Sequence, residues 1–119
     1  MKAVLIDAVN KTITNCNINN GLETFYKLLN CQTVTAPVVL ENNDTLFCDD
    51  EALLKPAYHF FKLSYNGYEN YFAGNGLIVG TNDEGGSVDV ETTAEEIQRH
   101  ITFMDLQQVR EEVAWKKPV

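Results

Sequence analysis

Short apolar runs and polar turns alternate along the first quarter of the chain. The run Lys2–Asp7 is typical of a central strand, and residues 11–18 alternate between polar and apolar side chains as a second strand would. Residues 8–10 between them predict a hairpin turn. Apolar side chains then recur at helical spacing from Leu22 to Leu29, so the pattern predicts a helix from Gly21 to Leu29 or Asn30.

The next segment predicts a second hairpin. Residues 34–40 are rich in β-branched side chains, but they contain Pro37, which favours an edge strand or a bulge. Residues 42–44 are turn formers that lead into a strand over residues 45–48. Residues 49–56 then predict a single helical turn, because acidic residues begin it and a proline ends it.

Aromatic residues dominate the third hairpin. Residues 58–63 and 68–72 are strand candidates, and Asn66-Gly67 between them is the dipeptide that supplies the positive φ angles of a type I′ turn. Residues 77–80 predict a buried strand. A short return strand over residues 87–90 follows a glycine-rich acidic loop.

Helix-capping residues mark three helix starts. Asn20 followed by Glu23 resembles an N-cap with its capping-box partner at the start of the first helix. Two overlapping capping boxes over residues 92–96 predict a helix from near Ala94 to about His100. Asp105 is the expected N-cap of a last helix.

The order of these elements predicts one α+β domain. We expect a small, mainly antiparallel sheet with two or three helices packed on one face. At 119 residues the chain is long enough for a single domain over residues 1–119, with a helical extension from about residue 105. Residues 101–104 fit either a final short strand or the end of the preceding helix. The pattern leaves open whether Trp115 packs on its own domain or on a neighbouring copy.

Charge narrows the classes of partner. The net charge is −8, and most of the carboxylates gather in two blocks, at residues 41–51 and 83–96, neither of which contains a lysine or an arginine. Direct nucleic-acid binding is therefore not expected, because the chain would repel phosphates. No apolar run approaches the length of a membrane helix and no signal peptide opens the chain, so we expect a cytoplasmic protein of a bacterial host that does not bind membranes.

No catalytic or metal site emerges from the reactive residues. The three cysteines are widely spaced, and Cys48 precedes two aspartates that would raise the pKa of its thiol. His59 and His100 lie in unrelated contexts, without a nucleophile placed beside either one. The glycines at 74–86 match neither a phosphate-binding loop nor a dinucleotide fingerprint, and the acidic residues there lack the spacing of a calcium loop. We therefore expect no enzyme activity, no metal and no cofactor.

Two segments carry a resemblance to a known group of proteins. They are Asp44–Pro56, with the sequence DTLFCDDEALLKP, and Gly74–Gly86, which contains the run NGLIVGTNDEGG from Asn75 onward. In their order the elements up to about Thr102 resemble a family of small uncharacterised proteins of bacteriophages and mobile elements, classified only as a domain of unknown function. The resemblance implies a genetic setting and a fold, but no activity.

These observations favour a protein that acts by binding. The expected role is a non-enzymatic phage or mobile-element accessory protein that antagonises a host or anti-phage defence component. One alternative is an oligomeric sponge that sequesters a nucleotide-derived immune signal, and the other is an acidic DNA mimic. A host protein and a small nucleotide ligand both remain candidate partners, and a homo-oligomer remains open.

The candidate binding residues fall into three groups. Exposed aromatic side chains of a hairpin can form an interface or stack on a base. The turn residues near the glycines mark tightly specified backbone, and the arginines are the side chains best suited to phosphate groups. The candidates are Tyr65, Tyr68, Tyr71, Asn75, Asn82, Asp83, Glu84, Arg99 and Arg110.

Overall fold

The structure is a computed structural model that describes residues 1–116. Within that range the chain forms nine strands, three α-helices and one 3-10 helix, η1. The strands are β1 Lys2–Asp7, β2 Thr12–Asn17, β3 Val34–Val39, β4 Asp44–Asp49, β5 His59–Tyr65, β6 Tyr68–Ala73, β7 Gly76–Thr81, β8 Ser87–Val88 and β9 Ile101–Asp105. The helices are α1 Leu22–Leu29, η1 Ala52–Leu54, α2 Ala94–Gln98 and α3 Leu106–Lys116. The Trp115 side chain and residues 117–119 lie outside the described part.

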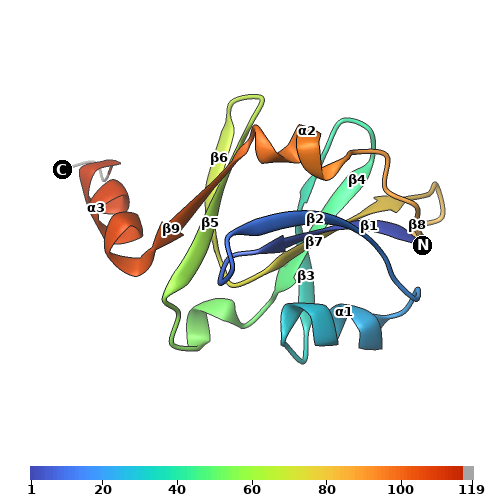
Figure 1. The fold of residues 1–119 in the computed structure, drawn as a ribbon, viewed down its shortest axis with the longest axis horizontal. Helices are drawn as coiled ribbons and strands as arrows, with labels where there is room; N and C mark the ends of the chain where they lie inside the picture. The colour runs from blue at the N-terminus through green and yellow to red at the C-terminus, as the bar shows by residue number, and fades with distance from the viewer. Residues whose placement is uncertain (117–119) are drawn as a thin grey trace.

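Two antiparallel sheets make up the domain (Figure 1). The larger sheet has the order β2-β1-β7-β4-β3, with β8 paired to β7, and the smaller one has the order β6-β5-β9. All these pairs are antiparallel, which confirms the α+β class with a mainly antiparallel sheet. β7 lies between β1 and β4 and joins the first two hairpins into one sheet.

The two faces of the larger sheet are covered differently. Successive side chains of a strand point to opposite faces. Val4 of β1 belongs to the core that includes the smaller sheet and α2, whereas Ala3 belongs to the core beneath Phe25 and Leu29 of α1. Helices α1 and α2 therefore pack on opposite faces of the larger sheet, and the expectation of helices on one face is wrong. The helical pattern showed which side of each helix is apolar, but not which sheet face it covers.

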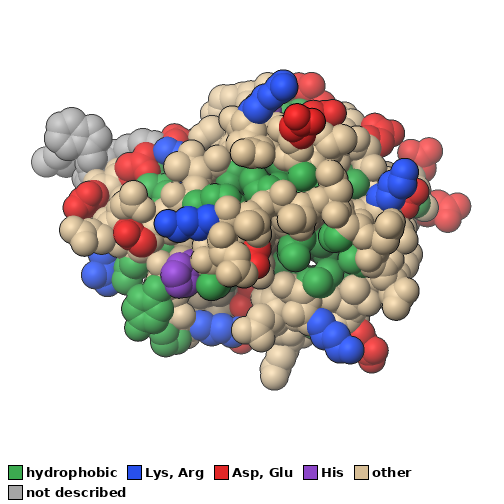
Figure 2. Space-filling model, in the orientation of Figure 1, with side chains coloured by type: hydrophobic (Ala, Val, Ile, Leu, Met, Phe, Trp, Pro, Cys, Tyr) green, Lys and Arg blue, Asp and Glu red, His purple; other side chains and the backbone are tan. Residues whose placement is uncertain are grey.

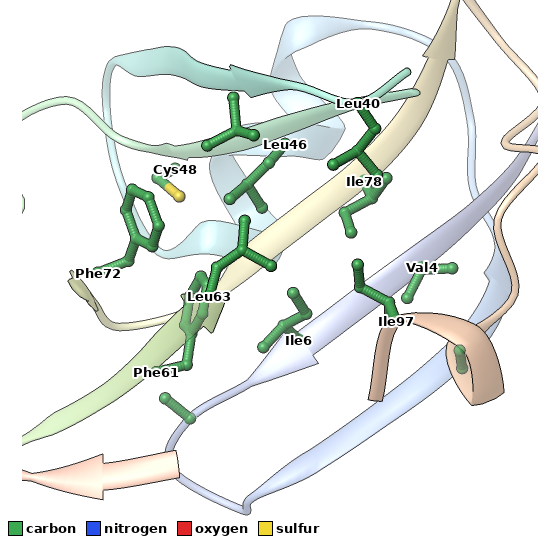
Figure 3. Close-up of a cluster of buried hydrophobic side chains, with 13 residues drawn as sticks. Val4, Ile6, Leu40, Leu46, Cys48, Phe61, Leu63, Phe72, Ile78 and Ile97 are labelled. Atoms are coloured by element: carbon green, nitrogen blue, oxygen red, sulfur yellow. The ribbon is translucent and has the colours of Figure 1, made fainter. Parts of the chain in front are cut away.

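The main core lies between the two sheets (Figure 3). Phe61 and Leu63 of β5 point toward Ile6 of β1 and Leu46 of β4, and Ile97 of α2 closes the same cluster. Phe61 is fully buried, and its ring lies 5.2 Å from that of Phe72. The two sheets therefore share one hydrophobic cluster.

Helix α3 covers the outer face of the smaller sheet. Leu106 and Val109 pack against the cluster formed by Phe60, Ala73 and Met104. The Glu112 carboxylate lies 2.8 Å from the Lys62 ammonium of β5, which adds a charged contact between helix and sheet. Asp105 caps α3 as expected: its Oδ1 accepts a hydrogen bond of 2.8 Å from the backbone of Gln108, whose side chain accepts one of 2.9 Å from the backbone of Asp105.

Of the other two expected helix N-caps, the one of α2 is found and the one of α1 is not. Thr93 caps α2 through a 3.2 Å hydrogen bond from the backbone N–H of Glu96, but α2 ends at Gln98, earlier than expected. The expected Asn20 cap of α1 is wrong. Gly21 occupies the N-cap with a φ of 142°, and the Asn20 amide instead donates to the carbonyl oxygen of Ser87 at 3.3 Å.

Three local features of the strands follow their turn residues. β3 is an edge strand with a register shift between Thr35 and Val38, as Pro37 indicated. Asn66 and Gly67 have φ angles of 46° and 83°, which confirms the turn between β5 and β6. Residues 101–105 form a strand rather than the end of a helix, because they pair with β5.

Candidate binding surface

The tyrosines of the aromatic hairpin contribute mainly to packing. Tyr65 is half-buried, and its ring contacts His100 edge-on with 5.3 Å between ring centroids. Tyr71 is half-buried on the outer face, where the Lys62 ammonium lies 6.0 Å from its ring centroid. Tyr68, beside the turn, is the more exposed of the three at 38%. The hairpin therefore offers less aromatic surface than its sequence suggested.

Asn75 braces the connection between β6 and β7. Its side-chain oxygen accepts a hydrogen bond of 3.1 Å from the backbone of Ala8, and its amide donates to the carbonyl oxygen of Leu28 at 3.4 Å. The side chain thus ties the β1–β2 turn to the end of α1. Asn75 also lines a cavity of about 280 Å³.

The acidic loop after β7 is a self-contained turn. The Asn82 side-chain oxygen accepts hydrogen bonds from the backbone of Glu84 at 3.0 Å and of Gly86 at 2.8 Å, while the Asp83 and Glu84 side chains are exposed. Gly85 has a φ of 82°, in the region that glycine adopts most readily. In the described part of the chain no three His, Cys, Asp or Glu side chains gather in a way that would hold a metal ion.

The two candidate arginines lie in different parts of the fold. Arg99 is the C-cap of α2, and Arg110 is on α3, which packs on the other face of the smaller sheet (Figure 1). Arg110 lines a second hollow, of about 310 Å³, together with Tyr58. The structure therefore does not bring the nine candidate residues into one site, but it places Asn75 and Arg110 on either side of one segment.

In that segment, residues 52–58, Ala52 and residues 55–58 form a wall common to both hollows. Several of its side chains are exposed, including Leu54 at 82% and Tyr58 at 65%, and Val9 of the β1–β2 turn, 58% exposed, lines the first cavity beside it. We call this region the Tyr58 surface; it consists of Val9, Leu54, Lys55, Pro56 and Tyr58. Figure 2 shows hydrophobic side chains gathered beside a histidine and basic side chains over the connection between η1 and β5.

Local hydrogen bonds hold Val9 in its exposed position. The Asp7 carboxylate accepts hydrogen bonds from the backbone of Val9 at 3.1 Å and of Asn10 at 3.0 Å, and a third from the Asn10 side chain at 2.7 Å. Burial raises the pKa of Asp7, but the hydrogen bonds from Asn10 and Val9 outweigh it, so the pKa is lowered. The turn is thus fixed by its own side chains.

Lys55 is the charged group at the centre of the Tyr58 surface. Its ammonium lies 2.7 Å from the Asp49 carboxylate, and this hydrogen bond is the largest cause of the raised pKa of Lys55. The other Asp49 oxygen accepts a 2.9 Å hydrogen bond from the backbone of Glu51, at the start of η1. Because an ammonium has three donors, Lys55 can bind a further acceptor while it stays bound to Asp49.

The Tyr58 surface was not among the sequence candidates. Tyr58 was assigned to the aromatic strand, but β5 begins at His59 and leaves Tyr58 outside the sheet. The sequence feature that could have revealed this surface is Pro56-Ala57, between η1 and β5. Pro56 ends the helical turn, so the strand begins only at His59. Exposed apolar side chains next to hollows are typical of protein-binding surfaces.

The reactive side chains do not form a catalytic arrangement in the described part. Burial, then Asp49, raises the pKa of the Cys48 thiol to about 12, and burial also raises the pKa values of Cys16 and Cys31. A thiol with a raised pKa is a poor nucleophile at neutral pH. His59 and His100 lie at opposite ends of β5. His59 is the first residue of the strand, and the His100 ring lies 3.0 Å from the carbonyl oxygen of Ser64 near its end.

Comparison with known proteins assigns a family but no activity. Residues 1–102 match the family described as "Domain of unknown function (DUF3846)". No curated protein and no solved structure matches the chain. Among the described residues no helix has the length and apolar character needed to cross a membrane.

Proposed function

The chain belongs to the DUF3846 family of unknown function, and we propose that it is a non-enzymatic binding protein that contacts a partner protein through the Tyr58 surface. The observation that carries the proposal is the exposure of Tyr58, which lines both hollows, and of Val9, which lines the first, together with that of Leu54 on the same segment as Tyr58. Tyrosine is enriched among residues that dominate binding energy, because it buries much area and loses little conformational entropy.

The chemistry of the Tyr58 surface indicates what the partner offers. Apolar side chains of the partner would fill the hollows beside residues 52–58, and a hydrogen-bond acceptor of the partner would bind the Lys55 ammonium. In its most specific form the proposal is that the protein is a phage or mobile-element accessory protein and that the partner is a host or defence component. The resemblance of Asp44–Pro56 and Gly74–Gly86 supports this genetic setting.

A double substitution tests the proposal. Leu54→Ala with Tyr58→Ala removes the two most exposed apolar side chains of the surface without touching the core. We expect the partner to bind about 30-fold more weakly, the effect of losing one dominant contact. Native mass spectrometry of the tagged protein from host lysate measures which masses stay bound.

The matched control is Val39→Ala. Val39 is 61% exposed on β3 and lines none of the hollows beside residues 52–58. The control should keep the bound mass that the double variant loses. A partner retained equally by all three proteins would contradict the proposed surface, and so would recovery of the wild-type chain with no bound mass.

The cavity beside the Tyr58 surface favours a second candidate, the nucleotide sponge. It is lined by hydrogen-bonding side chains that include Asn30, Lys55, His59 and Asn75, and its volume is about 280 Å³. A cyclic nucleotide held there would raise the melting temperature of the protein, because only the folded state binds it. Lys55→Met should abolish that rise, and the absence of any rise in the wild type would exclude this candidate.

Acidic side chains at one edge of the molecule support the DNA-mimic alternative. Figure 2 shows Asp and Glu side chains along the edge of the molecule over α2 and the β7–β8 loop. They come from the block at residues 83–96, which includes Asp83 and Glu84. A mimic would compete with DNA for a basic protein, and the competition would weaken as the salt concentration rises.

A further inference from the structure

Strand β2 presents a row of backbone groups at the border of the larger sheet. The pair next to the Lys2–Asn17 end of the β1–β2 ladder shows its hydrogen-bonding pattern, because Met1 and Ile18 exchange two backbone hydrogen bonds, of 2.8 Å and 2.9 Å. Hydrogen-bonded and non-hydrogen-bonded pairs alternate in an antiparallel ladder. Cys16, Thr14 and Thr12 therefore bond to β1, and the residues of β2 that alternate with them direct their backbone groups outward.

The outward residues are Ile13, Asn15 and Asn17. β2 is the terminal strand of the sheet, and no element in the described part of the chain pairs with its outer side (Figure 1). The Asn15 side chain accepts a 2.9 Å hydrogen bond from the backbone of Ala94, which ties α2 to the strand but leaves the backbone of Asn15 available. Each outward residue thus offers one donor and one acceptor along an edge.

The sequence of β2 lacks the strand features by which proteins often prevent edge pairing. Those features are prolines, bulges and charged side chains. The opposite edge, β3, has both Pro37 and a register shift. β2 pairs with β1 in an unbroken register from Lys2–Asn17 to Asp7–Thr12, and no charged residue occurs from Thr12 to Leu22. A neutral, regular edge in a chain of net charge −8 is suited to another strand.

We propose that two copies of the chain pair antiparallel through β2 and join their larger sheets into one. With the two-fold axis at Asn15, Ile13 of each copy lies opposite Asn17 of the other, and all three outward residues fall in hydrogen-bonded positions. Such pairs exchange two hydrogen bonds each, so the contact forms about six. This inference is independent of the Tyr58 surface, which lies on other elements.

Charge and symmetry identify the occupant as a second copy. Two chains of net charge −8 repel each other, and the repulsion is least where the contact itself brings no like charges together; β2 meets that condition on both sides at once. Antiparallel pairing of identical strands is two-fold symmetric, so the assembly closes at two copies. Pro37 and the register shift of β3 oppose further growth from the other edge.

The oligomeric state gives the first test. We expect light scattering after size-exclusion chromatography to give twice the chain mass of 13.4 kDa, with a shift to monomer on dilution. Asn17→Pro removes an outward N–H without removing a hydrogen bond to β1, and it should abolish the dimer. Asn17→Ala keeps that N–H and should leave the dimer intact. A monomer at about 1 mM, or assembly beyond two copies, would overturn the proposal.

Crosslinking tests the register even if the proline variant fails to fold. The two-fold axis places Thr14 opposite Cys16 of the second copy in a non-hydrogen-bonded pair, where the Cα atoms are about 4.5 Å apart, within disulfide range. Thr14→Cys should form a disulfide-linked dimer under mild oxidation. Thr12→Cys lies opposite Ile18 of the second copy and should not. Equal crosslinking of both variants, or of neither, would contradict the proposed pairing.

Discussion

At the residue scale, Asp44 joins two segments that are distant in sequence. It is fully buried, and its carboxylate accepts hydrogen bonds from the backbone of Glu91 at 3.1 Å and of Thr92 at 2.7 Å, and from the Asn42 amide at 3.1 Å. The carboxylate therefore fixes the connection between β8 and α2 against the start of β4. These contacts satisfy a buried charged group, which would otherwise be costly to fold.

Replacement of Asp44 tests this role. Asp44→Ala leaves two backbone donors, the buried one of Thr92 and the partly buried one of Glu91, without their acceptor, so we expect the free energy of unfolding to fall by about 2–4 kcal/mol. Asp83→Ala, in an exposed loop, is the control and should change it by less than about 0.5 kcal/mol. Urea denaturation followed by circular dichroism measures both. Similar losses in the two variants would show that Asp44 does not brace the loop.

Cys48 gives a pH-dependent stability. Its pKa is raised from 9.0 to about 12 in the folded protein, so the folded state keeps the proton over a range where the unfolded state loses it. The protonated Cys48 thiol makes its full contribution to the free energy of unfolding below pH 9. That contribution is lost as the pH rises toward 12, and the free energy of unfolding then falls by about 1.4 kcal/mol per pH unit. Cys48→Ala should flatten that slope in urea titrations between pH 8 and about 11; an unchanged slope would assign it to other groups.

Single residues were predictable where their chemistry is local. Asp105 and Thr93 were found as helix caps because a cap needs only a side chain within a few residues of its target. Asn75 was selected as a candidate binding residue, yet its hydrogen-bond partners, Ala8 and Leu28, lie far along the chain. Long-range contacts of this kind leave no periodicity in the sequence.

At the element scale, α3 packs on the smaller sheet through its first turn. Val109 is half-buried against the outer face of the smaller sheet, whereas Val113, one turn later, is 37% exposed. We expect Val109→Ala to cost about 1 kcal/mol of unfolding free energy, because it removes two packed methyl groups. Val113→Ala should cost less than about 0.5 kcal/mol. Thermal melts compare them, and a larger cost for Val113→Ala would place the main contact of α3 later in the helix.

Elements could be predicted more fully than their arrangement. The hairpin turn at Asn66-Gly67 was found because two positive φ angles demand particular residues. The Tyr58 surface was missed because no particular residue is required there: a tyrosine just before a strand and a tyrosine within it give the same sequence pattern. Pro56 was interpreted as the end of a helical turn. The first hollow beside it forms only because residues 73–75, distant in sequence, line the same cavity.

At the scale of the whole molecule, the two sheets share one core. Phe61 of the smaller sheet is fully buried against the larger one, so Phe61→Ala should lower the free energy of unfolding by about 3–5 kcal/mol. Both sheets should still unfold in a single transition, with coincident near- and far-ultraviolet circular dichroism curves. Tyr68→Ala, exposed in the same hairpin, is the control. Two separate transitions in the wild type would contradict the shared core.

The domain class was predictable, but the strand order was not. Hairpins follow from adjacent strands and short turns, whereas the place of β7 between β1 and β4 depends on which edges meet after the hairpins form. The helices on opposite faces follow from that same closure. Val4 and Ala3 read equally as apolar in the sequence, and only the closed sheet assigns them to separate cores.

The central place of β7 also affects how the chain is made. The β1–β2 and β3–β4 hairpins leave the ribosome before residues 76–81, and they have no contact with each other in the sheet until β7 joins them. Non-local strand pairing is slow, and a nascent chain folds only with the segments already synthesised. The growing polypeptide therefore carries two unjoined hairpins with uncovered apolar faces until Thr81 has emerged, and we expect chaperones to bind it during that interval.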